Sequence, residues 1–293
     1  VNEAFVKVSG SWKEVQEGYI KVSGAWKQFY QAFVATGYTQ QTSSTTVAVP
    51  TGANAIHIQA AVGGGSGGVG GAEYDKAGGE SAGAGGASGG YISDKIFTVA
   101  EGETLTLTVG SGGALSSGGY NTTAGNGGTT SLSGNSTGSI FSLAGGTGGS
   151  SSGGGVQGPL RSNNPSSAGA ATISASAITT SSLSFKEANG ASVTIGTAVT
   201  LDDGPVGSFN QSGNGVAGTN PGNCSGDNCQ ITGGVGGSSY NGNISGGAGG
   251  VASSSSGGNG TRGSGAGGGG AQGQTAGGTG GGGEIYYRFL RLT

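Results

Sequence analysis

The stretch Ala55-Ile-His-Ile-Gln-Ala-Ala-Val-Gly-Gly-Gly-Ser-Gly-Gly-Val-Gly-Gly71 contains the two patterns that decide the fold of this chain. In its first part Ile56 and Ile58 alternate with His57 and Gln59, which predicts a β-strand with one buried face and one polar face. In its second part glycine dominates, and each ordered glycine costs about 0.5–1 kcal/mol of free energy relative to alanine. So many ordered glycines require a compensating interaction.

The composition favours an ordered protein with unusual packing. Glycine supplies 73 of the 293 residues, whereas charged residues make up 9% and hydrophobic residues 32%. The net charge of −3 is too small to repel the chain open, so the composition does not predict disorder. A flexible glycine–serine linker is the alternative interpretation. Well-patterned strands interrupt the glycine tracts, however, and no segment has the pattern of an amphipathic helix, so we expect an all-β fold.

Several glycine tracts repeat with a period of three, as in Gly64, Gly67 and Gly70. A left-handed helix of the polyproline II type has three residues per turn, so every third residue lies on the same edge. Glycine edges allow such helices to pack side by side, and their N–H and C=O groups then bond between helices. We therefore predict polyglycine II-type helices in the later half of the glycine-rich body. Long disordered glycine loops are the alternative.

Two copies of one unit open the sequence. Phe5-Val-Lys-Val-Ser-Gly-Ser-Trp-Lys-Glu-Val15 recurs 14 residues later as Tyr19-Ile-Lys-Val-Ser-Gly-Ala-Trp-Lys-Gln-Phe29. Each unit has a short strand, a Ser-Gly turn and a second strand, which predicts a β-hairpin. Because a lone hairpin is marginally stable, we expect Trp12 and Trp26 to pack on each other, on a second chain or on a neighbouring subunit. We favour a core role for both tryptophans over ligand stacking.

Two further strand patterns stand out in the body. Residues 91–99 and 104–109 flank the turn Ala100-Glu-Gly-Glu103 and are predicted to form a hairpin. Residues 284–292 form a closing strand. Its alternate residues on one face are Ile285, Tyr287 and Phe289.

The composition divides the chain into four parts. Residues 1–35 form a repeated β-hairpin attachment region, and residues 36–158 form the first part of a glycine-rich β domain. Residues 159–231 contain less glycine and several short strand patterns, so they form an inserted β segment and a possible receptor-binding tip. Residues 232–293 return to glycine-rich tracts and end in the closing strand.

These residues resemble a known family. Gly37-Tyr-Thr and the string from Val47 to Gly65 resemble the opening of the glycine-rich domain found in many bacteriophage tail fibres and related surface proteins. The element from Gly89 to Gly113 is similar to that family's second hairpin, and Gly280-Gly-Gly-Gly-Glu-Ile-Tyr-Tyr287 to its closing step. The resemblance covers about residues 36–293, from which residues 159–231 depart. It implies a virion-associated, host-facing protein, often trimeric in a fibre shaft.

We therefore expect a virion structural protein of a phage tail fibre, located in the virion tail, that binds the bacterial surface without catalysis. Its expected partners are other tail or fibre proteins through the N-terminal hairpins, a surface saccharide or outer-membrane protein of the host, and further copies of itself. One alternative is an extracellular matrix or filament-forming surface protein. Another is an ice-binding protein, although the sequence has no regular threonine or alanine ladder at every third position.

Several chemistries have no support in the sequence. The one histidine, His57, has no paired carboxylate or nucleophile pattern, so we expect no enzyme. The sequence has no phosphate-binding loop, and Asp202, Asp203 and Asp227 lack the ligand spacing of a calcium site. The 11 basic residues are scattered, and no apolar run approaches the roughly 20 residues of a membrane span. We expect no cofactor, no metal, no nucleic acid and no membrane insertion.

Adhesion is usually carried by loops on a rigid scaffold. Aromatic residues beside Asn, Asp and Ser suit contacts with saccharides or outer-membrane proteins. The receptor-binding candidates on this basis are Tyr74, Tyr120, Phe209, Asn210, Asn223, Asp227 and Tyr240. Cys224 and Cys229 are the two cysteines, and a small disulfide loop in an oxidising setting suits their spacing better than a zinc site or free thiols.

Overall fold

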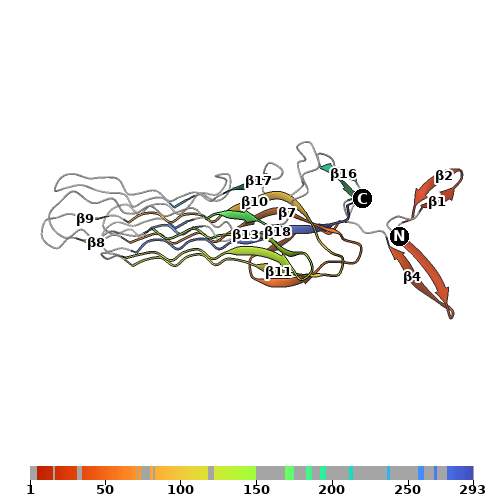
Figure 1. Ribbon diagram of the computed structural model, residues 1–293, viewed down its shortest axis with the longest axis horizontal. Helices are drawn as coiled ribbons and strands as arrows, with labels where there is room; N and C mark the ends of the chain where they lie inside the picture. Colours follow the sequence, from red (N-terminus) through yellow and green to blue (C-terminus); the bar gives the residue numbers. More distant parts are fainter. Residues whose placement is uncertain are drawn as a thin grey trace.

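The computed structural model describes residues 5–15, 17–31, 35–70, 72–73, 80–81, 83–117, 122–149, 169–174, 183–186, 192–195, 211–213, 236–237, 257–260, 267–268 and 276–292. All regular secondary structure in these residues is β, which confirms the all-β prediction. Figure 1 shows an elongated body in which the strands lie at one end and the glycine tracts extend from them.

Two five-stranded antiparallel sheets form the stranded end of the described body. The first sheet consists, in order, of β17 (Gln211–Gly213), β10 (Tyr91–Thr98), β7 (Ala55–Val62), β18 (Glu284–Leu290) and β5 (Thr39–Gln41). The second sheet consists, in order, of β14 (Ala171–Ile173), β13 (Gly138–Leu143), β12 (Thr130–Gly134), β11 (Thr104–Thr108) and β6 (Thr45–Ala48).

The remaining strands pair two by two. These pairs are β1 (Phe5–Val8) with β2 (Ser11–Glu14), β3 (Glu17–Val22) with β4 (Ala25–Gln31), β8 (Ala72–Glu73) with β9 (Glu80–Ser81), and β15 (Leu183–Lys186) with β16 (Ser192–Ile195). Two strands of the segment 159–231, β14 and β17, instead extend the edges of the two large sheets.

The two sheets share one hydrophobic core. Alternate residues of β7 and β18 enter it, including Ile56, Ile58 and Tyr287, and the predicted buried face of the closing strand is confirmed. Phe97 of the first sheet lies 6.2 Å from Phe141 of the second, measured between ring centroids. Alternation places these apolar side chains on one face of each strand, so the two faces cover each other.

The predicted pairing of residues 91–99 with residues 104–109 is wrong. β10 pairs with β7 and β17 in the first sheet, whereas β11 pairs with β6 and β12 in the second. The chain crosses between the sheets at residues 100–103, so Phe97 and Leu105 enter the same core from opposite sides. An alternating pattern specifies which face of a strand is buried, but it does not specify which strand is the partner.

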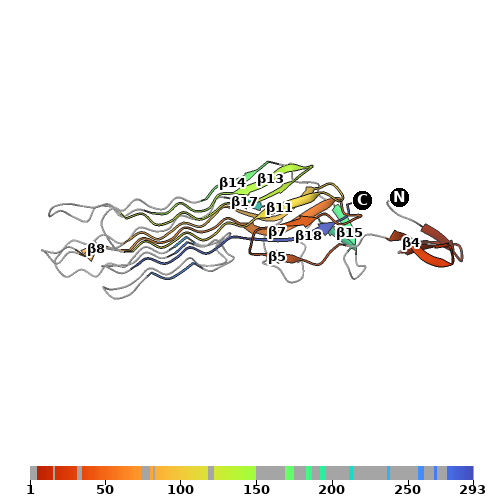
Figure 2. The ribbon, with the colours of Figure 1, turned by 90° about the horizontal axis from the view of Figure 1, so that it is seen from below.

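The glycine tracts continue these strands as a rod, shown from below in Figure 2. Along residues 63–69, each N–H donates to a different segment from the residue before it, and the same segment recurs at every third residue. The N···O distances are 2.8–3.0 Å. The donor–acceptor pairs are Gly63–Gly90, Ser66–Ala87 and Val69–Ala84, then Gly64–Gly128 and Gly67–Gly125, then Gly65–Gly281 and Gly68–Gly278.

The carbonyl groups of the same tract accept from other segments. Gly146 donates to Gly64, Gly113 to Gly65, Gly268 to Ser66 and Ser116 to Gly68, at 2.8–3.2 Å. Within the described residues, the tract 63–70 therefore has six hydrogen-bonded neighbours, and every residue in it is buried. The six neighbouring segments are 83–90, 122–129, 276–283, 110–117, 144–149 and 267–268.

The rod brings together segments that the sheets keep apart. Residues 63–70 continue a strand of the first sheet and residues 122–129 lead into a strand of the second, yet Gly64 N lies 2.9 Å from Gly128 O. Facing sheets are ordinarily about 10 Å apart, because side chains fill the space between them. A Cβ atom on Gly67 would come closer than 3.0 Å to the carbonyl of Ala114. The absence of side chains at such positions allows the two sheets to merge into one body.

Replacing Gly67 should therefore damage the rod, although alanine suits its backbone conformation. We expect Gly67→Ala to lower the free energy of unfolding by about 1–3 kcal/mol, the usual cost of overpacking, as measured by chemical denaturation. Gly282→Ala is the matched control, because its nearest described neighbour would lie 3.7 Å from the new Cβ. Equal stability of the two variants would contradict the close approach at Gly67.

Candidate functional site

The residues predicted as sites all lie outside the described residues. This holds for Tyr74, Tyr120, Phe209, Asn210, Asn223, Asp227 and Tyr240, and for Cys224 and Cys229. Two of them fall in short gaps between described segments. Tyr74 falls between β8 and β9, which Figure 1 places at the end of the rod far from the sheets, and Tyr120 falls between residues 117 and 122.

The two N-terminal hairpins form the first surface that the structure describes. Lys7 pairs with Trp12 in the first hairpin, and Lys21 pairs with Trp26 in the same position of the second. Both residues of each Ser-Gly turn have positive φ values, 50° and 85° in the first turn and 51° and 82° in the second. This backbone is the type I′ turn that matches the twist of a two-stranded hairpin. The two hairpins thus share one turn conformation and one Lys–Trp pairing.

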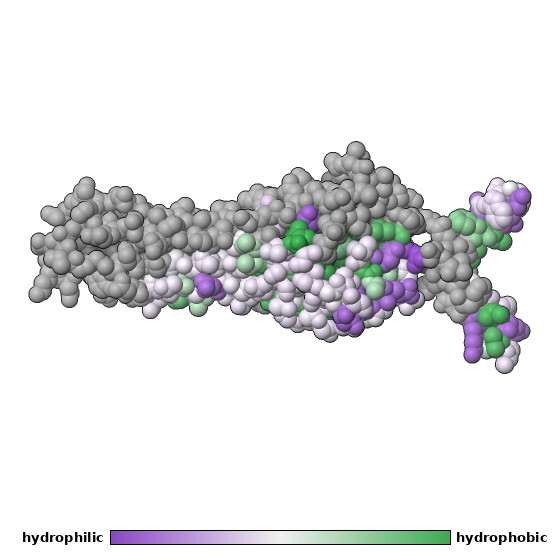
Figure 3. Space-filling view, viewed as in Figure 1, coloured by the Kyte–Doolittle hydropathy of each residue, from purple (hydrophilic) through white to green (hydrophobic). Residues whose placement is uncertain are grey.

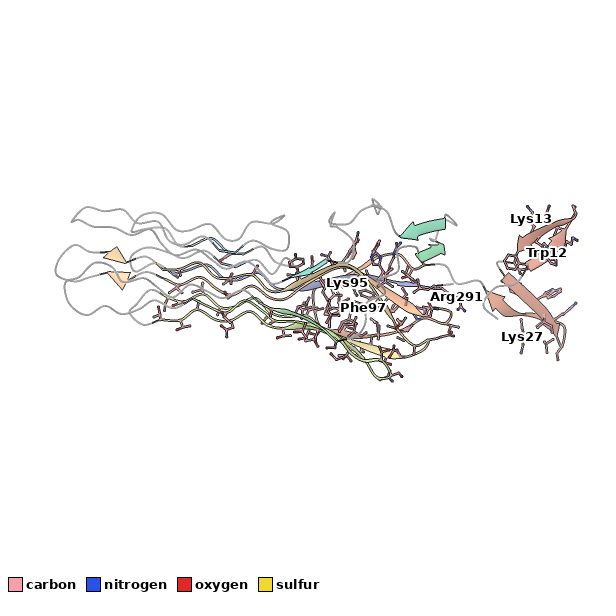
Figure 4. All side chains as sticks on the ribbon, turned by 45° about the horizontal axis from the view of Figure 1, so that its top comes forward. Trp12, Lys13, Lys27, Lys95, Phe97 and Arg291 are labelled. Carbon is pink, nitrogen blue, oxygen red and sulfur yellow. The ribbon has the colours of Figure 1, made fainter. Side chains whose placement is uncertain are left out.

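Neither tryptophan is a core residue of the described chain, so the favoured core role is wrong within one copy. The side chains of Trp12 and Trp26 are each 68% exposed. The ammonium groups of Lys7 and Lys21 lie 5.9 and 6.0 Å from the centroids of their indole rings, at the outer limit of a cation–π contact. Figure 4 shows Trp12, Lys13 and Lys27 on these hairpins, away from the body. Apolar side chains and lysines occur on both faces of each hairpin, and no described layer covers them.

A second polar cluster lies on the outer face of the first sheet. Tyr38 stacks on Tyr286 with ring centroids 5.1 Å apart, and its hydroxyl lies 3.1 Å from Nδ1 of His57. The guanidinium group of Arg288 lies 4.4 Å from the centroid of the Tyr38 ring. Tyr38 belongs to the segment that leads from the hairpins to β5, so this cluster holds that segment against the body.

The outer face of β7 is polar as predicted, but it is buried as well. His57 is fully buried and Gln59 is 3% exposed. Ala60 pairs with Tyr286 and Ile58 with Tyr287, so Gln59 is the extra residue of a β-bulge. Its side-chain oxygen has no hydrogen-bond partner among the described residues. His57 contacts the Tyr38 hydroxyl and is paired in register with Arg288, so it helps to hold the segment that contains Tyr38.

The described residues provide no metal centre. Among them, no group of three or more His, Cys, Asp or Glu side chains could hold a metal ion. A membrane-spanning helix is likewise not found in the part of the chain that the structure describes.

The carboxylate of Glu103 is a buried ion at the corner between the two sheets, 4% exposed. It accepts hydrogen bonds from the backbone N–H groups of Ala100, Ser136 and Thr137 at 2.7, 3.2 and 3.0 Å, and from the Thr137 hydroxyl at 2.5 Å. Burial raises the pKa of Glu103, whereas these hydrogen bonds to its ionised form lower it. The combined effect of the hydrogen bonds is larger than the effect of burial, so the pKa lies below its ordinary value. The carboxylate ties the turn after β10 to the turn between β12 and β13.

A family model described as a glycine-rich domain matches residues 39–290. Thr39 is the first residue of β5 and Leu290 is the last residue of β18, so the match includes both large sheets and the glycine segments between them. The two N-terminal hairpins precede it. No curated protein matches the chain.

Acid should weaken the body through Glu103. Because its pKa is lower in the folded than in the unfolded state, its hydrogen bonds contribute fully above the ordinary pKa of 4.5 and are lost as the pH falls through the folded pKa. We expect Glu103→Gln to lower the free energy of unfolding at neutral pH by roughly 1–3 kcal/mol. Chemical denaturation at a series of pH values should also show a weaker loss of stability in acid than in the unaltered chain.

Glu284 provides a control, because its pKa is shifted in the opposite direction from that of Glu103. Burial raises the pKa of Glu284 more than the hydrogen bond from Gln40 lowers it, so ionisation of this carboxyl opposes folding. Glu284→Gln should therefore not lower the stability at neutral pH as Glu103→Gln does. If the Glu103→Gln variant loses stability in acid as steeply as the unaltered chain, Glu103 is not the group responsible.

Proposed function

The chain belongs to the glycine-rich domain family, and on that basis we propose that it is a virion structural protein of a bacteriophage tail fibre that binds the bacterial host surface without catalysis. The observation that carries this proposal is the rod, in which one glycine tract has six hydrogen-bonded neighbours among the described residues. A fibre needs a stiff spacer between the end that is attached and the end that binds. A body with hairpins at one end and a rod that extends from the sheets to the other end suits that requirement.

In this proposal the glycine segments are polyglycine II-type helices. Recurrence of the same neighbour at every third residue supports this assignment, because such a helix has three residues per turn. The added Cβ atoms of Gly83, Gly86 and Gly89 would each come closer than 3.0 Å to a carbonyl of residues 63–69, which gives the same period from steric contact. The central tract, 63–70, belongs to the first half of the body, so the proposal extends beyond the later half.

Host recognition is assigned to the end of the rod far from the sheets. The chain leaves the rod at Gly70 and re-enters it at Gly83, and it leaves at Ser117 and re-enters at Thr122. Tyr74 and Tyr120 belong to these two connections. Phe209 and Asn210, by contrast, directly precede β17, which is an edge strand of the first sheet. We therefore favour Tyr74 and Tyr120 over the residues of the segment 159–231.

The N-terminal hairpins form the attachment end, for other tail or fibre proteins or for further copies of the chain. They are joined to the body by Tyr38 and the edge strand β5. A matrix or filament-forming surface protein remains the alternative for a chain with the same rod and no host-binding end.

Ice binding is a second candidate that one observation favours. Thr123, Asn126 and Thr129 are exposed at every third position of one rod segment. Ser111 and Ala114 are exposed with the same period on the segment beside it. The sequence alone shows no regular ladder, because only the packing reveals which third positions are exposed. The ladder is short, and it carries alanine and asparagine as well as threonine, so we place this function second.

Binding of the labelled, purified chain to a panel of bacterial surfaces tests the proposal. We expect saturable binding to some strains, weakened at least about 10-fold by Tyr74→Ser combined with Tyr120→Ser, since aromatic residues dominate such contacts. Phe209→Ser combined with Asn210→Ser is the matched control and should leave binding unchanged.

Three other results of this experiment would each lead to a different conclusion. Loss of binding in the Phe209 and Asn210 variant alone would return the site to the segment 159–231. A folded chain that binds no strain would overturn the host-binding proposal. Inhibition of ice recrystallisation by such a chain would favour the second candidate.

A further inference from the structure

Each N-terminal hairpin is too small to be stable as the structure describes it. β1 pairs with β2 and β3 pairs with β4, and neither hairpin has a third strand among the described residues. Isolated two-stranded hairpins are at best marginally stable in water, and they need further strands or a packing partner. A hairpin without a third strand has two edges at which another strand can add. The hairpins therefore need a surface that one copy of the described chain does not provide.

The uncovered apolar area has the size of a protein interface. Figure 3 shows green, hydrophobic patches beside purple, hydrophilic ones on the hairpins. Apolar side chains are exposed on both faces of the hairpins. Their exposed fractions are 53% for Phe5, 48% for Val6, 49% for Val8, 68% for Trp12, 49% for Tyr19, 53% for Ile20, 42% for Val22 and 68% for Trp26. With about 200 Å² for each aromatic side chain, the four aromatic residues alone leave on the order of 500 Å² uncovered, and the four aliphatic residues add to that area. A standard interface buries about 800 Å² on each partner.

The charges of the hairpins allow them to associate with the hairpins of a second copy of the chain. Residues 5–31 contain four lysines and the two acids Glu14 and Glu17, a net charge of +2 (4 − 2). Acidic and basic side chains are thus both present on one small unit. A surplus of two charges is largely screened beyond about 8 Å at physiological salt. The apolar area therefore outweighs the repulsion between copies.

We propose that the tandem hairpins, residues 5–31, join copies of this chain to one another. A second copy offers the same two hairpins, with matching register and the same exposed tryptophans. Pairing or stacking of these hairpins would cover the faces that one copy leaves open. Because two equivalent units lie on each chain, both can bind at once, and the second contact forms at the high effective concentration of a short linker. This inference does not depend on the tail-fibre proposal.

The only two tryptophans of the chain, Trp12 and Trp26, make the test specific. Tryptophan fluorescence of the full chain reports on the hairpins alone, and sedimentation reports on the number of copies. We expect an oligomer whose tryptophan emission shifts to shorter wavelength and becomes protected from a soluble quencher as concentration rises. Trp12→Ser combined with Trp26→Ser should raise the dissociation constant at least about 30-fold, as expected for tryptophans at the centre of an interface.

Leu115→Ser is the matched control. Leu115 is an exposed apolar residue of the rod, 41% exposed, and its replacement should leave the oligomer unchanged. The thermal midpoint of the body should be the same in all three proteins once each is compared in the monomeric state. A full chain that stays monomeric with solvent-exposed tryptophans at every concentration overturns the proposal, even if its hairpins bind a different protein. An oligomer that the double tryptophan variant retains overturns it as well.

Discussion

Hydrogen bonds between backbones that lie side by side without side chains are the interaction on which this structure depends. Each N–H of residues 63–69 finds a carbonyl on a neighbouring segment, and the direction of bonding changes at every residue. Such contacts require glycine wherever a Cβ atom would meet a carbonyl, as at Gly67 and Gly86. The high glycine content is therefore a packing requirement of the rod, and a linker would have no such requirement.

The energetics explain why the rod is built onto a pair of sheets. A buried backbone hydrogen bond contributes a net of about 0.5–1.5 kcal/mol, whereas ordering a glycine costs about 0.5–1 kcal/mol relative to alanine. These two magnitudes nearly cancel, so the rod gains little from its own bonds. The hydrophobic core around Ile58, Phe97 and Phe141 supplies what is missing. It also sets the register, because β7 leads directly into a rod segment, and β10 and β18 directly follow rod segments.

The sequence predicts local patterns well and partners poorly. The buried face of the closing strand and the strand at Ala55–Gln59 follow from alternation, and the hairpin units follow from their Ser-Gly turns. The period of three in the glycine tracts predicts the spacing of the contacts in the rod. It does not predict which six segments surround the central tract. The crossing at residues 100–103 could not be predicted, because alternation does not identify a partner strand. The exposure of Trp12 and Trp26 could not be predicted from the sequence either, because it depends on whether another layer covers the hairpins.

Native-state hydrogen exchange of the full chain tests the central claim, that the glycine tract at 63–70 is an ordered, hydrogen-bonded interior. The account predicts that the amide protons of residues 64–69 exchange as slowly as those of β7, since both open only when the whole body unfolds. Exchange of these glycine amides at the rate of an unstructured chain, while β7 remains protected, would contradict the account.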